Sequence, residues 1–169
     1  MGILTDDMKR VVRQQRLGFI ATVCPDGSPN LSPKGTATVW DDDHLVFADL
    51  GSPVTIENLG HNPACEINVI DTFLRKGYRF KGTAQVLTGG DLFDEIKEAY
   101  ATGSHGIQRS GLPARGYVLM TVTKAAPLVS PGYTPGKTEA AMREEWTGYW
   151  AAVQESNSQS VRPGSQTGT

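Results

Sequence analysis

The chain has 169 residues with 38% hydrophobic and 20% charged side chains, a composition that predicts one folded domain and excludes wholesale disorder. Its formal net charge of −2 gives no broad attraction to nucleic acid, and no apolar run approaches the roughly 18 residues of a membrane span. Residues 1–16 are charged and lack the apolar segment of a secretory signal, so we expect a cytoplasmic protein without membrane or nucleic-acid partners.

The first half of the chain predicts one helix and an antiparallel meander. Apolar residues recur at helical spacing over residues 5–15, and two acidic residues suit the helix start. Three β-prone segments follow at 17–24, 30–40 and 45–48. The turns between them are short: one contains Pro and Gly, and the other contains three aspartates. Strands joined in this way pair antiparallel and do not need the crossovers of a parallel sheet.

The second half of the chain predicts further helices and strands. Ser52 and Pro53 suit the N-cap and first position of a helix that ends before Pro63. Strands are expected at 64–69, 78–87 and 117–122, and helices at 91–100 and 139–153. Residues 102–116 are rich in Gly and Ser and predict a long mobile loop. Within this loop, two roles stay open for His105: a surface histidine, or a proton donor near a bound ligand.

The number and length of these elements predict the fold class and the domain organisation. Six short strands with short helices between them indicate an α+β fold with a small β-barrel core. Residues 1–130 are expected to form the barrel domain, and residues 131–155 a C-terminal helical extension. Residues 156–169 are expected to be a flexible tail, because a segment of mostly Ser, Gln, Gly and Thr cannot offset the entropy lost on ordering.

An anion-binding segment is predicted in the second strand, where Ser32, Pro33, Lys34 and Gly35 follow one another. Pro33 lacks a ladder donor and therefore favours an edge strand or a bulge. Gly35 lets another group approach the backbone, and Lys34 supplies a charge suited to a phosphate. The ordinary alternative is a solvated bulge in an edge strand.

The helix start at Ser52 and Thr55 is a second candidate for an anion site. Its free amides, its partial positive charge and these two hydroxyls would complete such a site. Ser-Pro is also a common helix cap, so this segment has an ordinary structural interpretation as well. Asp49 argues against a phosphate here, because a nearby carboxylate repels it unless the carboxylate is turned aside.

The cysteine and histidine pattern indicates neither a metal site nor a nucleophilic triad. Cys24 and Cys65 lie far apart and are expected to be small buried residues, not a disulfide. The spacing of the three histidines matches no metal-binding motif, and the sequence contains no G-x-S-x-G. We therefore predict no metal and assign no catalytic side chain.

Five segments in a fixed order carry a resemblance to a known family. They are LGFIATV at 17–23, DGSPNLSPKG at 26–35, LVFAD at 45–49, NLGHNP at 58–63 and YRFKGTA at 78–84. In this series the chain resembles the pyridoxamine 5′-phosphate oxidase-like, FMN-binding split-barrel family over roughly residues 5–126. The resemblance implies a six-stranded antiparallel split β-barrel with short flanking helices, and a homodimer with FMN across its interface.

The resemblance also implies the residues that hold the cofactor. In this family the second strand and the turn after the third strand hold the phosphate. The residues at matching positions are Ser32, Pro33, Lys34, Gly35, Ser52, Thr55 and Asn58, with Arg79 on the face that touches the flavin. Val54 stands where relatives often place a basic residue, so neutralisation of the phosphate would depend more on Lys34.

Three functions are compatible with this resemblance. The first is an FMN-dependent oxidoreductase that acts on a small organic molecule with electrons from NAD(P)H. The second replaces FMN with the deazaflavin F420, whose acidic tail would need more basic residues, such as Arg75, Lys76, Arg109 and Arg115. The third is a flavin-binding or carrier protein without a substrate. The C-terminal pyridoxal-phosphate signature of the true oxidase is not recognisable, so vitamin B6 oxidation is not expected.

Overall fold

The structure is a computed structural model that describes residues 2–107, 111 and 113–160. Its helices are α1 (Asp6–Gln15), α2 (Pro53–His61), α3 (Asp91–Thr102) and α4 (Glu139–Ser160), with a short 3-10 turn, η1 (Ser104–Gly106). Its strands are β1 (Gly18–Val23), β2 (Pro29–Lys34), β3 (Thr38–Val39), β4 (His44–Asp49), β5 (Ala64–Asp71), β6 (Lys76–Leu87) and β7 (Gly116–Val129).

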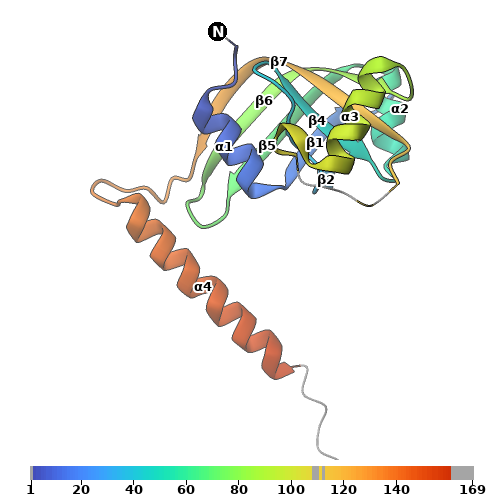
Figure 1. The fold of residues 1–169 in the computed structure, drawn as a ribbon. Coiled ribbons are helices and arrows are strands. Elements are labelled where there is room, and N and C mark those ends of the chain that lie inside the picture. Colours follow the sequence, from blue (N-terminus) through green and yellow to red (C-terminus); the bar gives the residue numbers. More distant parts are fainter. Residues whose placement is uncertain (1, 108–110, 112, 161–169) are drawn as a thin grey trace, which may run out of the picture. The chain divides into compact units, whose positions relative to one another are not determined.

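The described residues form one curled sheet of seven strands, in the order β2-β1-β5-β6-β7-β4-β3 (Figure 1). This confirms the α+β split barrel, but the predicted count of six strands is wrong. The segment predicted as one strand over residues 30–40 breaks after Lys34, and its second part pairs with β4 as β3. The break occurs where Pro33 and Gly35 weaken the strand. Thr36 lies in the break, where its hydroxyl accepts a hydrogen bond from the amide of Ala48 (3.1 Å).

The two edges of the sheet, β2 and β3, are therefore consecutive in the sequence, and the barrel is split between them. Tyr100 of α3 holds the connection between these edges: its hydroxyl donates to the carbonyl of Thr36 (2.7 Å). Burial raises the pKa of this phenol above its ordinary value. The link between the edges is thus anchored to a buried side chain and not left as a free loop.

The hydrophobic core follows from the alternation of side chains along the strands. On β1, Ile20 points into the barrel and is fully buried, whereas its neighbour Phe19 points outward. Val12 of α1 packs into the same core as Ile67 and Phe80 of β5 and β6. A second cluster lies where α3 covers the other face of β4 and β7, so that β4 is buried on both faces.

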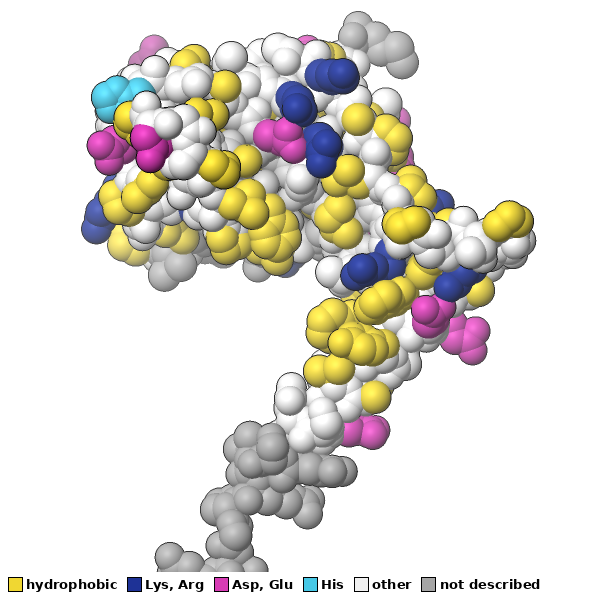
Figure 2. Space-filling model, turned by 180° about the vertical axis from the view of Figure 1, so that it is seen from behind, with side chains coloured by type: hydrophobic (Ala, Val, Ile, Leu, Met, Phe, Trp, Pro, Cys, Tyr) yellow, Lys and Arg dark blue, Asp and Glu magenta, His cyan; other side chains and the backbone are white. Residues whose placement is uncertain are grey.

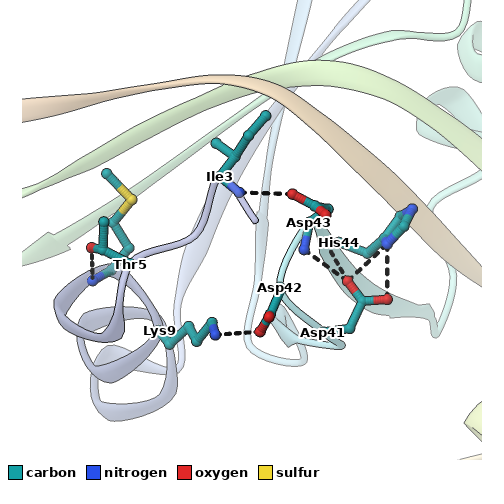
Figure 3. Close-up of polar contacts among 8 residues, drawn as sticks. Ile3, Thr5, Lys9, Asp41, Asp42, Asp43 and His44 are labelled. Carbon is teal, nitrogen blue, oxygen red and sulfur yellow. Dashed lines mark hydrogen bonds and ion pairs between the residues drawn. The ribbon is translucent and has the colours of Figure 1, made fainter. Parts of the chain in front are cut away.

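The start of the chain is tied to the turn between β3 and β4 (Figure 3). The amide of Ile3 donates to the carboxylate of Asp43 (2.7 Å), and Lys9 of α1 forms an ion pair with Asp42. Asp41 accepts bonds from the amides of Asp43 and His44 and from the His44 ring. Burial alone would raise the pKa of Asp41, but these hydrogen bonds hold the pKa below its ordinary value.

Several predicted boundaries shift in the structure. The last strand extends to Val129, and the terminal helix extends past Val153 to Ser160, where the hydroxyls of Ser156 and Ser158 bond to carbonyls of the preceding turn. The predicted loop over 102–116 begins with the last residue of α3 and with η1. Its residues 108–110 and 112, and residues 161–169 of the predicted tail, lie outside the described residues.

The cysteines are both free thiols in the structure. Cys65 is buried as predicted, and burial raises the pKa of its thiol to about 12. Cys24 is half-buried and accepts a hydrogen bond from the side-chain amide of Asn58 (3.4 Å). The raised pKa and burial of Cys65 are the opposite of the environment of a reactive cysteine.

The chain divides into two compact units: Met1–Asp71 with Lys76–Leu128 form the barrel unit, and Thr72–Arg75 with Val129–Thr169 form the C-terminal unit. Within the C-terminal unit, the guanidinium of Arg75 lies 4.1 Å from the ring centre of Trp146, and the Tyr133 hydroxyl donates to the carbonyl of Leu74. Hydrophobic side chains gather along α4 (Figure 2). No helix in the described part of the chain has the length and apolar character that a membrane crossing requires.

Candidate functional site: a cationic cleft at the split of the barrel

The barrel unit contains a cleft of about 470 Å³ beside its two sheet edges. It is lined by residues 33–38 of the β2–β3 segment, by Ala48 and residues 50–52 after β4, by Arg13 and Arg16 of α1, and by Tyr100, Gly106 and Ile107. Three of these residues are cations, and no Asp or Glu of the described chain is among them. We call this the cationic cleft.

Lys34 is the best-defined charge in the cationic cleft. It ends the edge strand β2, is only 7% exposed, and donates from Nζ to the hydroxyls of Ser32 (2.7 Å) and Ser52. Burial lowers the pKa of Lys34, and the nearby charge of Asp49 partly opposes this shift. The ammonium is therefore partly desolvated, and no carboxylate of the described residues forms a hydrogen bond with it, an environment that favours binding of an anion.

Asp49 does not compete for the same position, because its carboxylate is turned toward the backbone. Oδ1 accepts hydrogen bonds from the amides of Gly51 (3.1 Å) and Ser52 (2.9 Å), and the side chain is buried. This geometry meets the condition set by the sequence, that the carboxylate must be turned aside. It also fixes the turn that carries Ser52 into the cleft.

The predicted role of Ser52 as a side-chain helix cap is wrong. Ser52 does stand at the N-cap position of α2, with Pro53 as the first helical residue, but its hydroxyl makes no capping hydrogen bond. The hydroxyl instead accepts a hydrogen bond from Lys34. The buried ammonium is a stronger donor than a backbone amide, so the hydroxyl serves the cleft and not the helix.

Thr55 and Asn58 lie outside the lining of the cationic cleft. Each is 1% exposed, and together with buried Thr22 and half-buried Asn30 they form what we call the buried polar cluster. The amide of Asn58 donates to the hydroxyl of Thr22 (3.0 Å). The amide of Asn30 donates to Thr22 (3.1 Å) and more weakly to Thr55 (3.4 Å). These bonds fasten α2 to β1 and β2.

Arg79 lies on the outer face of the sheet, away from the lining of the cleft. Its guanidinium forms an ion pair with Glu66 (2.9 Å) and a long hydrogen bond with Asn68 (3.4 Å). The strand register places Arg79 opposite Asn68, Asn68 opposite Phe19, and Phe19 opposite Pro33. We call these four residues the outer row. Because Pro33 also lines the cleft, the outer row begins at the cleft and crosses four strands.

The structure thus brings together five of the eight predicted residues. Pro33, Lys34, Gly35 and Ser52 line the cleft, and Ser32 contacts the ammonium within it. The sequence analysis assigned no role to Arg13 and Arg16, which lie in the last turn and at the C-cap of α1. Helical spacing does not predict this pair, because Arg16 follows the last helical residue in a left-handed conformation.

His105 is not part of the lining of the cationic cleft. Its ring stacks on Trp40 with 4.7 Å between ring centres, and its backbone has φ 54. A positive φ is uncommon for a residue other than glycine. The stacked ring and the adjacent Gly106, which does line the cleft, show that this turn is ordered against the barrel.

Comparisons with known proteins agree with this architecture. The family model described as pyridoxamine 5′-phosphate oxidase matches residues 4–128. HupZ of Group A Streptococcus is 30% identical, with a TM-score of 0.64 over 75% of this chain and 94% of that one. An FMN-binding protein of Syntrophomonas wolfei is 18% identical, with a TM-score of 0.58 over 73% of this chain and 88% of that one. An F420 reductase is 20% identical, with a TM-score of 0.54 over 72% and 98%. No curated protein matches the chain significantly.

Proposed function

This chain belongs to the pyridoxamine 5′-phosphate oxidase-like family of split barrels, and from that premise we propose that it is a flavoprotein whose cationic cleft holds the phosphate of FMN. One observation carries the proposal. The ammonium of Lys34 is 7% exposed, lies between two hydroxyls, and has no carboxylate at hydrogen-bond distance in the described chain.

The residues of the cleft fit a phosphate group. A desolvated ammonium without a counter-ion is costly, and a phosphate would supply the missing negative charge. The hydroxyls of Ser32 and Ser52 can turn to donate to phosphate oxygens. Ser52 also stands at the N-terminus of α2, whose partial positive charge favours an anion. Lys34, Ser32 and Ser52 would therefore hold the phosphate.

The outer row provides a surface for the flavin ring. Pro33 connects the cleft to this row, and the four residues span roughly 14 Å, three strand spacings of about 4.8 Å. Phe19 supplies an apolar surface, and Arg79 a cation at the far end. A flat apolar ring with a charged tail needs this combination of apolar surface and one anion site. Phe19 and Arg79 are thus the residues that we expect beside the ring.

We further propose that the protein is a homodimer and that the outer face of β1 and β2 is the contact. Phe19, Val23 and Leu31 point outward there and are 38%, 36% and 63% exposed. Leu31 is paired with Ala21, so these side chains form one apolar strip. A second copy that covers the strip would also enclose a ring lying on the outer row.

Leu31→Lys tests the dimer. A lysine at this exposed position should leave folding intact and place a charge in the contact, so the variant should sediment as a monomer at micromolar concentration and bind flavin more weakly. Thr83→Lys, on an exposed position of β6, is the matched control and should remain dimeric. A wild-type protein that sediments as a monomer with flavin bound would contradict the proposed dimer.

When bound, FMN supplies hydride or electron transfer, while the protein residues bind and orient it. We propose a small organic substrate, NAD(P)H as the electron donor, and a cytoplasmic location. Because an F420 reductase has the same fold, the deazaflavin F420 is the second candidate for the cofactor. A flavin carrier without catalysis is the third possibility, and a lack of flavin reduction by NADH and NADPH would favour it.

The absorption spectrum of the purified protein and the mass of its released ligand test the identity of the cofactor. FMN should give the bands of an oxidised flavin and the mass of FMN. The mass of F420 would replace the first candidate by the second. A protein that neither carries a flavin nor binds added FMN would contradict the proposal.

Lys34→Gln tests the position of the phosphate. Loss of a charge-assisted hydrogen bond costs about 1.5–3 kcal/mol, so FMN should bind about tenfold to a hundredfold more weakly. Riboflavin lacks the phosphate, so its affinity should be nearly unchanged. Both are measured by fluorescence titration of the apoprotein, with Lys124→Gln at an exposed position as the control. Equal losses for both ligands would place the phosphate elsewhere.

A further inference from the structure

Two arginines of the cationic cleft have no partner in the described part of the chain. Arg13 and Arg16 lie at the C-terminal end of α1 and line the cleft, and neither makes a hydrogen bond or ion pair with a described side chain. Arg10 of the same helix differs, because its guanidinium binds Asp7 (2.6 Å) and Gln14 (2.8 Å). Arg10 is thus paired within the helix, whereas Arg13 and Arg16 face the cleft.

Two glycines of the cleft lie beside these arginines. A Cβ at Gly35 would lie 3.8 Å from the carbonyl oxygen of Arg16, so Arg16 is beside the residue that follows Lys34. A Cβ at Gly106 would lie 3.4 Å from Nε of Arg13, and Gly106 has a positive φ of 69. Both distances are ordinary van der Waals contacts, and they place Arg16 beside Gly35 and the Arg13 side chain beside η1.

Arg16 also occupies a backbone conformation that favours glycine. Its φ is 52, in the left-handed region, at the C-cap of α1. Glycine is the usual residue at such a helix end, because a side chain there is strained. The partial negative charge of the helix C-terminus favours a cation there, but it does not require the cation to stand at the strained C-cap position. Strained residues of this kind are concentrated at ligand-binding sites.

The charges of the cleft exceed what one phosphate neutralises. A phosphate monoester carries about −1.5 to −2 at neutral pH. Arg13, Arg16 and Lys34 supply three positive charges, and no carboxylate of the described chain lines the cleft. With the phosphate held at Lys34, about one positive charge or more of the cleft remains unmatched. Guanidinium groups bind carboxylate and phosphate oxygens in pairs of parallel hydrogen bonds.

We propose that Arg13 and Arg16 form a second oxyanion subsite in the cationic cleft, which binds a carboxylate or phosphate group of the molecule that reacts with the bound flavin. This inference rests on the proposed function, and it specifies the substrate class as a small anionic molecule. The arginines differ from Lys34 in their role: Lys34 binds the cofactor, and the arginines bind the second ligand.

The test uses FMN-loaded protein and two probes, inorganic pyrophosphate and malonate, at constant ionic strength. Flavin fluorescence should change saturably with at least one probe, and the stronger of the two identifies the preferred oxyanion. In Arg13→Gln/Arg16→Gln the dissociation constant of that probe should rise about tenfold to a hundredfold. FMN affinity should change less than about threefold, since this variant keeps Lys34. Arg10→Gln removes the same charge from the same helix and should behave like wild type.

Arg16→Gly separates binding from folding. Glycine relieves the positive φ, so the midpoint of urea unfolding should rise, while the probe binds more weakly. If Arg16 has only a structural role, Arg16→Gly should raise the urea midpoint and leave the affinity for the probe unchanged. That result would overturn the proposal. Equal probe affinities in wild type and the double variant would also overturn it. A loss of FMN affinity in the double variant as large as the loss in Lys34→Gln would overturn the proposal too, because the arginines would then bind the cofactor phosphate.

A failure of the proposed function gives a different result from a failure of this subsite. If the protein binds no FMN, the same probes are titrated into the apoprotein by calorimetry. Binding of pyrophosphate or malonate that is lost in Arg13→Gln/Arg16→Gln would support the subsite although the flavin assignment fails. Binding that is absent, or that is unaffected by the double variant, would overturn the subsite as well.

Discussion

The cationic cleft and the buried polar cluster both draw on β2 and on the region where α2 begins, but they serve opposite purposes. Lys34 and Ser52 face the cleft, where the buried ammonium has no hydrogen-bonded carboxylate among the described residues. Asn30 and Asn58 face the barrel, where their amides bond to Thr22. No buried polar side-chain atom of the described residues lacks a hydrogen-bond partner.

Neighbouring residues thus contribute to different properties: some to ligand binding and others to the stability of the fold. A satisfied buried network stabilises the fold, whereas a desolvated charge destabilises it until a ligand supplies the opposite charge. Substitutions in the two regions should therefore change different quantities: the free energy of unfolding in the buried polar cluster, and the affinity for FMN in the cleft. The following predictions test this separation.

Asn58→Ala should have the largest effect on stability. It removes the donor to Thr22 and leaves a small cavity under α2, so the free energy of unfolding should fall by about 2–3 kcal/mol. Urea unfolding measures the loss. FMN affinity of the folded protein should be unchanged, because Asn58 does not line the cleft.

Glu57→Ala, at the exposed neighbouring position, is the control and should stay within about 0.5 kcal/mol of wild type. An Asn58→Ala protein with normal stability and weakened FMN binding would contradict the separation. That result would support a role for Asn58 in cofactor binding, as the family resemblance implies.

Lys34→Met should increase the stability of the apoprotein, by about 1 kcal/mol. Methionine fills the space of the lysine stem without a desolvated charge, and the hydroxyls of Ser32 and Ser52 remain close to the open cleft. Urea unfolding without ligand measures the gain, and FMN titration should show weaker binding in the same variant. A large loss of stability would mean that Lys34 is part of the scaffold.

The pH dependence of this gain follows from the lowered pKa of Lys34. The folded protein holds this proton less tightly than the unfolded chain, whose lysine has the ordinary pKa of 10.5. The charged form destabilises the fold most at pH below the lowered pKa, and this cost decreases as pH rises toward 10.5. The stability difference between Lys34→Met and wild type should therefore shrink as the pH rises through the lowered pKa of Lys34 toward 10.5. A difference that grows would contradict the lowered pKa.

Thr55→Val should have the smallest effect. The hydroxyl accepts one long hydrogen bond from Asn30 (3.4 Å), so its loss should reduce the free energy of unfolding by about 0.5–1 kcal/mol. FMN affinity should be unchanged, as for Thr83→Val at an exposed strand position. If Thr55→Val weakens FMN binding and leaves stability unaltered, the hydroxyl reaches the phosphate as the family resemblance implies.

Local sequence patterns determined the elements and their order. Alternating side chains defined β6, the Pro and Gly of residues 25–29 defined the first hairpin, and helical spacing defined α1. Pro33 and Gly35 also marked the edge at which the sheet ends. The sequence did not show that residues 30–40 form two strands, because the pairing of β3 with β4 depends on contacts with another segment.

The sequence by itself thus determined the fold class, the family and the segment around Lys34, since each depends on residues that are close in the chain. Tertiary structure alone decided which polar groups face the cleft. The bond from Asn58 to Thr22 spans 36 residues, and the bond from Lys34 to Ser52 spans 18. Arg13 and Arg16 reach the cleft only because α1 packs beside Gly35. A polar side chain has the same local signature whether it binds a ligand or another buried group, and the difference arises only when the strands and helices pack.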